Sequence, residues 1–167
     1  MSGGRPTARG RHPITLVADN VRSLYNVGSL FRTCDGALVE KLYLCGFTPH
    51  PPRKEISKTA LGAEDSVPWE YVWDIAEALS FLKKQGKTIA ALEHTDRSIP
   101  VFDLAASAFP LVIVVGNEVV GVSARALEHC DMAIEIPMYG MKQSLNVAVA
   151  AGVALYECVR VLEAGSR

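Results

Sequence analysis

The amino-acid sequence predicts an α/β domain in which a mostly parallel β-sheet is flanked by helices. Short apolar runs alternate along the chain with segments of helical spacing, which is the order that strand–helix–strand units produce. Several runs are apolar on both faces, as buried strands of parallel sheets are. The length of 167 residues, with 49% apolar and 21% charged residues, suits one globular domain. We therefore expect a single domain over residues 13–167, after a flexible basic tail over residues 1–12.

The predicted strands are the apolar runs at residues 14–19, 41–46, 88–93, 110–116 and 132–137. Each run is short and is followed by Gly, Pro or polar residues, as strands are. Residues 46–68, rich in Pro, Gly and charged residues, are predicted to form the longest loop.

Helical spacing predicts a helix over residues 74–86, with Asp74 as its N-cap and a terminal glycine. A shorter helix is expected over residues 123–130. A long helix is expected over residues 144–165, with Ser144 as its cap, because small and apolar residues continue through this stretch.

The composition excludes several classes of protein. A net charge of −1 excludes a globally basic nucleic-acid binder, but it allows a local basic patch. The four cysteines are widely scattered, which argues against a zinc site and a disulfide framework and predicts reduced thiols. No signal peptide is recognisable, and the apolar run at residues 147–156 is too short to span a bilayer. We expect a cytoplasmic protein with no metal and no membrane partner.

The stretch "YNVGSLFRT", residues 25–33, combines an apolar helix opening with three polar or flexible positions. Asn26 stands at the predicted entrance to the helix, and Arg32 follows about two turns later. A cap and a solvated arginine would explain these residues structurally. A catalytic loop would explain them too, because Gly28 lets backbone approach a ligand closely.

Three predicted strand ends carry unusual loops, at the edge where open α/β sheets bind ligands. Residues 116–123, "GNEVVGVS", nearly match a phosphate-binding loop, but Val122 replaces its lysine and Glu118 would repel a triphosphate. No G-x-G-x-x-G fingerprint occurs either. The other two loops begin at Glu93 and His94 and, further on, at "MYGMKQSLN", where Asn146 interrupts an otherwise apolar helix start.

These stretches together resemble one family closely, the SpoU (TrmH-type) RNA 2′-O-ribose methyltransferases of the SPOUT class. "NVGSLFRT" looks like the first motif of that family, "IVVGNEVVGVS" like the second and "IPMYGMKQSLNVAVAA" like the third. All three occur in the family's order, and the resemblance extends over roughly residues 14–163.

The resemblance implies a fold, a cofactor and an assembly. The fold would be an α/β knot, with the C-terminal part tied in a deep trefoil knot, and the protein would be a homodimer with its active site near the subunit interface. The cofactor would be S-adenosylmethionine, converted to S-adenosylhomocysteine. Its expected binding residues are Leu92, Glu93, His94, Gly116, Asn117, Glu118, Ile136, Met141, Ser144 and Leu145.

The implied reaction is methylation of a ribose 2′-hydroxyl of transfer or ribosomal RNA. The expected catalytic residues are Arg32, Asn26, Glu118, Ser144 and Asn146. A guanidinium pKa above about 12 makes a literal arginine base a poor proton acceptor, so we expect Arg32 to stabilise the developing alkoxide and bind a phosphate. Asn26 and Glu118 would orient it.

RNA contacts are expected from cations that position the phosphates without reading sequence. These cations are Arg9, Arg11, Arg22, Arg53, Lys54, Lys58 and Lys142. The additional RNA-binding segments of some family members are not expected here. Two alternatives stay open: a non-catalytic RNA-binding relative, and an unknotted nucleotide-binding α/β protein.

Overall fold

The computed structural model describes residues 10–167, which are arranged around a seven-stranded sheet. Every pair of neighbouring strands is parallel, in the order β3-β2-β1-β6-β4-β7-β5. The strands are β1 (His12–Asp19), β2 (Val39–Cys45), β3 (Trp69–Val72), β4 (Thr88–Leu92), β5 (Ile99–Pro100), β6 (Leu111–Val115) and β7 (Met132–Glu135). The α-helices are α1 (Leu24–Gly36), α2 (Lys54–Ala60), α3 (Ala63–Ser66), α4 (Ile75–Lys84), α5 (Ala124–Leu127) and α6 (Val147–Gly165). The predicted mostly parallel sheet flanked by helices is confirmed.

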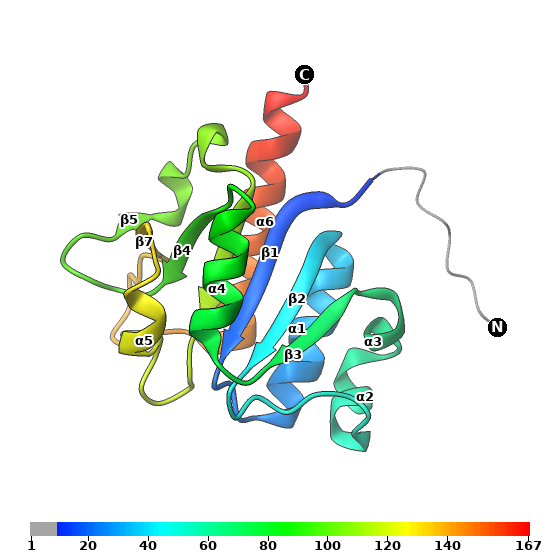
Figure 1. The fold of residues 1–167 in the computed structure, drawn as a ribbon. Helices are drawn as coiled ribbons and strands as arrows, with labels where there is room; N and C mark the ends of the chain where they lie inside the picture. The colour runs from blue at the N-terminus through cyan, green and yellow to red at the C-terminus, as the bar shows by residue number, and fades with distance from the viewer. Residues whose placement is uncertain (1–9) are drawn as a thin grey trace.

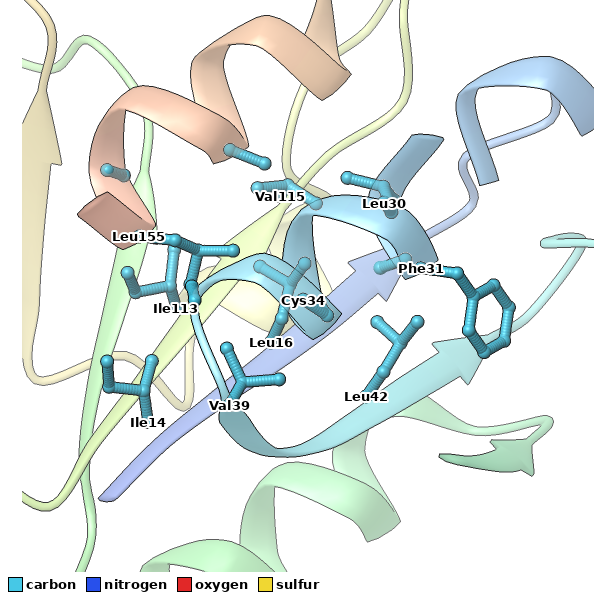
Figure 2. Packing of buried hydrophobic residues seen from close by; sticks show 14 of the residues in the cluster. Ile14, Leu16, Leu30, Phe31, Cys34, Val39, Leu42, Ile113, Val115 and Leu155 are labelled. Carbon is cyan, nitrogen blue, oxygen red and sulfur yellow. The ribbon is translucent and has the colours of Figure 1, made fainter. Parts of the chain in front are cut away.

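Helices cover both faces of the sheet (Figure 1). On the face of α1 and α6, the larger core cluster contains Leu16, Phe31 and Leu155 (Figure 2). On the opposite face, a second cluster joins Val17 of β1 to Leu79 of α4. Successive side chains of a strand point to opposite faces, so neighbouring Leu16 and Val17 belong to different clusters. This explains why the central strands are apolar on both faces.

The five predicted strands are all present, with ends displaced by no more than two residues. β3 and β5 were not predicted. They are four and two residues long and lie at the two edges of the sheet. Strands this short contain too few residues to show a clear alternation of apolar and polar side chains.

The prediction of one long loop over residues 46–68 is wrong, because this segment contains α2 and α3. A side chain at Gly28 of α1 would overlap the α2 backbone at Ile56 and the side chain of Thr59. The two helices therefore pack with close backbone contact. Helices this short are only marginally stable on their own, so their packing against the rest of the protein stabilises them. The local sequence pattern does not indicate such packing.

Two helix starts differ from the prediction. Ser23, not Asn26, caps α1, and its hydroxyl accepts a hydrogen bond from the Asn26 backbone N–H at 3.2 Å. The last helix begins at Val147 with Asn146 as its cap, so the expected cap at Ser144 is wrong. Ser and Asn are both favoured caps, and two candidates close together in sequence cannot be separated by residue preference. The predicted cap Asp74 on α4 is confirmed.

The N-terminal tail is only partly visible, since residues 1–9, Arg9 among them, lie outside the described residues. His12 already belongs to β1. The guanidinium of Arg11 donates hydrogen bonds to the backbone carbonyls of Val39 and Ser66, at 3.1 and 2.7 Å. From residue 10 onward, no helix is both long enough and apolar enough to cross a membrane.

Candidate active site

A cavity of about 570 Å³ opens at the carboxyl ends of β4, β6 and β7. Its walls are residues 92–94, 115–121, 135–136, 138, 143–147 and 150. Most of them belong to three segments, which we call the β4 loop (residues 93–98), the β6 loop (residues 116–123) and the β7 loop (residues 136–146). The volume lies within the range of small-molecule sites, and the position is where parallel sheets bind ligands.

The predicted cofactor-binding residues lie together on this cavity, with one exception. Met141 does not border it, and 99% of its surface is exposed. The others come from three strand ends that are distant in sequence but adjacent in the sheet.

The β6 loop is a tight turn whose shape depends on two glycines. Backbone N–H and carbonyl groups of Asn117 and Gly121 bond to each other in both directions at 3.0 Å. Gly121 has a positive φ of 74°, which favours glycine. A Cβ at Gly116 would overlap the backbone of Gly121 and Val122. The loop thus folds back on its own first residue, and residues 116–121 border the cavity.

Two carboxylates fix the far end of the β6 loop. Asp19, only 2% exposed, accepts a hydrogen bond from the Ser123 backbone N–H at 2.7 Å. Glu93 accepts another from the Val122 N–H at 3.0 Å. Asp19 was not among the predicted site residues, although an acidic residue ending a buried apolar strand is a signal that could have identified it. Glu93 was predicted as a cofactor contact, and the structure also gives it this supporting position.

Glu118 links the β6 loop to the start of α1. Its carboxylate accepts hydrogen bonds from the backbone N–H groups of Ser23 and Arg22 and from the Asn26 side chain, at 3.1, 3.2 and 3.3 Å. Burial raises the pKa of Glu118. These hydrogen bonds, together with one from its own N–H, lower the pKa by more than burial raises it, so the pKa lies below the ordinary value. Glu118 is therefore held as a carboxylate.

Asn26 continues this network to α6. Its carbonyl oxygen accepts a hydrogen bond from the Asn146 side-chain amide at 3.2 Å. The carbonyl oxygen of Asn146 in turn accepts from the N–H groups of Ala148 and Val149 at 2.9 and 3.3 Å. Three predicted catalytic residues from different parts of the chain are thus hydrogen-bonded in series.

Arg32 lies apart from this network. It is exposed on α1 and does not border the cavity, and its guanidinium makes no hydrogen bond or ion pair with any residue from 10 to 167. The expected contact from Asn26 or Glu118 is therefore not present within one chain. Ser144 is exposed and borders the cavity.

His94 and Glu135 face each other at the rim of the cavity. The His94 ring is hydrogen-bonded to the Glu135 carboxylate, which also accepts a bond from the Ser98 hydroxyl at 3.0 Å. The His94 contact, followed by the Ser98 hydroxyl, lowers the pKa of Glu135. Within residues 10–167, no three His, Cys, Asp or Glu side chains are grouped as metal ligands.

The predicted RNA-binding cations among the described residues are divided among four places. Arg53, Lys54 and Lys58 line a shallow hollow around the start of α2. Lys142 is exposed in the β7 loop, and Arg22 is exposed beside the Glu118 network. Arg11 is occupied by two backbone carbonyls, as described above.

Comparison with known proteins places these features in a family. The model of the SpoU rRNA Methylase family matches residues 13–156. A tRNA (guanosine(18)-2′-O)-methyltransferase from Aquifex aeolicus is 37% identical over 151 residues, covering 90% of this chain and 70% of the relative. A 23S rRNA (guanosine-2′-O-)-methyltransferase from Pseudomonas putida is 34% identical over 154 residues, covering 89% of this chain but only 59% of the relative.

Solved structures agree with the sequence relatives. The crystal structure of the A. aeolicus TrmH/SpoU tRNA modifying enzyme has a TM-score of 0.84 at 35% identity, over 94% of this chain and 79% of that one. The SpoU methyltransferase AviRb from Streptomyces viridochromogenes, in complex with AdoMet, has a TM-score of 0.80 at 27% identity, over 96% and 64% of the two chains. The described fold is shared with these two structures.

Proposed function

This chain belongs to the SpoU rRNA Methylase family, and from that membership we propose that it methylates a ribose 2′-hydroxyl of RNA with S-adenosylmethionine as the methyl donor. The observation that carries the proposal is the cavity at the ends of β4, β6 and β7, bordered by Glu118 and Asn146, which Asn26 joins to each other by hydrogen bonds. The relatives' names support both transfer RNA and ribosomal RNA as substrates, so the proposal covers either.

The cavity fits the proposed cofactor in size and in the groups it offers. Gly116 borders the cavity, and as a glycine it lets the β6 loop fold tightly there, because a Cβ at this position would overlap the backbone of Gly121 and Val122. Leu92, Ile136 and Leu145 add apolar contacts. When bound, S-adenosylmethionine supplies a methyl group activated by its sulfonium. An AdoMet complex of the related AviRb supports this use of the cavity.

The chain's own residues would position the ribose and assist the loss of the proton from its 2′-hydroxyl. The acceptor hydroxyl loses a proton as it attacks, and a nearby guanidinium stabilises the alkoxide that develops. We assign that role to Arg32, with an RNA phosphate or a water as the proton acceptor, because the guanidinium stays protonated. Holding both reactants together supplies much of the rate enhancement in such a displacement.

The separation between Arg32 and the cavity supports a homodimer. We propose that a second copy of the chain brings Arg32 close to the cavity. The α1 and α6 surfaces near Arg32 carry half-exposed Tyr25, Val149 and Tyr156, which a partner could cover. The glycine at position 152 of α6 stands next to Thr33 of α1, so the two helices present a joined surface.

The finer features of the fold are proposals as well. We propose that residues 13–167 form one methyltransferase domain and that its C-terminal part is a deep trefoil knot, which the likeness to the TrmH/SpoU structure supports. The RNA substrates and the four free cysteines, which are buried or partly buried, support a cytoplasmic location.

Methyl transfer to bulk transfer and ribosomal RNA tests the function, after a calorimetric titration with S-adenosylmethionine. We expect micromolar cofactor binding and transfer by the wild type. Arg32→Ala should bind the cofactor normally but lose at least 100-fold in transfer rate, whereas Lys84→Ala, an exposed cation on α4, should behave as wild type.

Other results would select the alternatives. Binding of RNA and cofactor without transfer would favour the non-catalytic relative, and ATP binding without S-adenosylmethionine binding would favour the nucleotide-binding protein. Full activity in Arg32→Ala would remove Arg32 from the mechanism.

A further inference from the structure

Two aromatic rings and one guanidinium lie together beside the candidate active site, and nothing described so far uses the rings. Phe47 and Trp73 are 61% and 62% exposed, and their ring centroids are 5.2 Å apart at an interplanar angle of 86°. The guanidinium carbon of Arg22 lies 5.0 Å from the Phe47 ring centroid. We call these three residues the aromatic cluster.

The aromatic cluster belongs to the same edge of the sheet as the cavity. Arg22, Phe47 and Trp73 follow the ends of β1, β2 and β3, which run parallel to one another. The cavity lies beyond β6, β4 and β7, the other half of that edge. β1 and β6 are neighbours, so the two halves meet at the point where the strand order reverses.

The backbone of the cluster is tied directly to the β6 loop. The N–H of Arg22 donates to the Glu118 carboxylate at 3.2 Å. The Asn117 side chain donates to the Asn20 carbonyl at 2.8 Å, while the Asn20 side chain accepts from the Phe47 N–H at 2.8 Å. Residues 20–22 therefore connect the exposed rings to the loop that borders the cavity.

The rings are exposed but are not loosely held. The Tyr71 hydroxyl donates to the Gly46 carbonyl at 2.7 Å, so the peptide before Phe47 is fixed on both its oxygen and its nitrogen side. Single exposed apolar residues are common and need no explanation. Two rings in contact, with the backbone at Phe47 fixed and a cation over the Phe47 ring, form a preorganised surface.

We propose that the aromatic cluster stacks an unpaired base of the RNA substrate, in a nucleotide next to the one that is methylated. This inference rests on the proposed function, because it takes RNA as the substrate. Unstacked bases are commonly bound on aromatic rings and on arginine guanidinium planes. The guanidinium of Arg22 makes no ion pair with a carboxylate among residues 10–167, so its charge is available to a phosphate of the same nucleotide. The cluster thereby selects unpaired over base-paired RNA near the target.

The test is the affinity of Phe47→Ala and Trp73→Ala for a single-stranded oligoribonucleotide, measured by fluorescence anisotropy. Loss of a stacked aromatic weakens binding of a base by about 10-fold or more. We expect that increase in Kd, a matching increase in KM for RNA, and a kcat within twofold of wild type. The matched control is Phe81→Ala, a half-exposed phenylalanine near the far end of α4, which should match wild type.

The salt dependence of RNA affinity distinguishes base stacking on the rings from electrostatic contacts with phosphates. Trp73→Ala should keep the wild-type slope of log Kd against log salt, because stacking releases no counterions. Arg22→Ala should reduce that slope by about 0.7, the value for one phosphate contact on a single strand. In Trp69→Phe, Trp73 is the sole tryptophan, and its fluorescence should be quenched when RNA binds.

Each contrary result has a distinct meaning. Wild-type methyl transfer with unchanged RNA affinity in both alanine variants would overturn the stacking proposal and leave the proposed function intact. Altered oligomeric state in those variants, with normal RNA affinity, would make the cluster a contact between copies and also overturn it. Absence of cofactor binding and methyl transfer in the wild type would refute the proposed function, and the stacking proposal with it.

Discussion

The β6 loop and the β7 loop border the same cavity but are held very differently. The β6 loop is fixed by its own Asn117–Gly121 bonds, by Asp19 and Glu93 at its far end, and by Glu118 through α1. In the β7 loop, residues 138–144 make no hydrogen bond with any residue from 10 to 167, and Tyr139 is 91% exposed.

This difference indicates that the two loops contribute to ligand binding in different ways. The β6 loop is preorganised, so a ligand that binds its backbone groups pays little ordering entropy. The β7 loop has the features of a segment that is ordered by a ligand or a partner, since residues 138–144 find no hydrogen-bond partner among residues 10–167 and the side chains of Tyr139 and Met141 are exposed. Substitutions in the two loops should accordingly differ in effect.

The largest contrast is expected between two glycines. Gly116→Ala places a Cβ into the backbone of Gly121 and Val122, whereas a Cβ at Gly140 of the β7 loop meets nothing within 4 Å. We expect Gly116→Ala to lose S-adenosylmethionine binding by more than 100-fold and Gly140→Ala to bind within twofold of wild type. Calorimetry on variants shown to be folded by circular dichroism checks this. Equal binding by both would mean that the shape of the β6 loop is irrelevant to the cavity.

A smaller effect is expected from the carboxylate that holds the far end of the β6 loop. Asp19→Ala leaves the partly buried Ser123 N–H without its partner, which should cost about 2 kcal/mol in the free energy of unfolding. Urea denaturation measures that cost, and hydrogen exchange at Ser123 should accelerate. Asp96→Ala, an exposed carboxylate of the β4 loop, is the control and should change neither quantity. Unchanged exchange at Ser123 would show that Asp19 does not fix the loop.

The smallest effect concerns pH. Because the pKa of Glu118 is lower in the folded protein than its ordinary value, its contribution to stability is complete above about pH 4.3 and is lost as the pH falls through the folded pKa. Glu118→Gln should therefore flatten the fall of the urea midpoint in this acidic range, while Glu128→Gln on the exposed end of α5 should leave it unchanged. If the urea midpoint of Glu118→Gln fell with pH as it does in the wild type, ionisation of Glu118 would not contribute to the acid sensitivity of the fold.

The sequence predicted the parts of the fold that have a strong local pattern. The runs that became β1, β2, β4, β6 and β7 were recognised because each is a short apolar run, several of them apolar on both faces. The edge strand β3 and the helices α2 and α3 were missed, since their stability comes from packing against β2 and α1. Such contacts between distant segments cannot be predicted from the local sequence.

The sequence motifs predicted which residues belong to the candidate site, but not how those residues are arranged. The motifs identified Asn26, Glu118 and Asn146, which the structure joins by hydrogen bonds. The spacing could not reveal that Arg32 stands apart from them, because that depends on how α1 is oriented against the β6 loop. Nor could it reveal the aromatic cluster, whose members become neighbours only when the strands align, whereas Asp19 could have been identified as an acidic residue that ends a buried apolar strand.

The hydrogen-bonded series from Glu118 to α6 has a fixed polarity. An ionised carboxylate can only accept, so Glu118 turns the NH₂ group of Asn26 toward itself and the carbonyl oxygen of Asn26 away. That oxygen then selects the NH₂ group of Asn146, which leaves the Asn146 oxygen facing the free N–H groups of α6. Two amides that could each point either way are thus set in one direction by a single negative charge. The first turn of the last helix is oriented by a residue 28 positions before its cap.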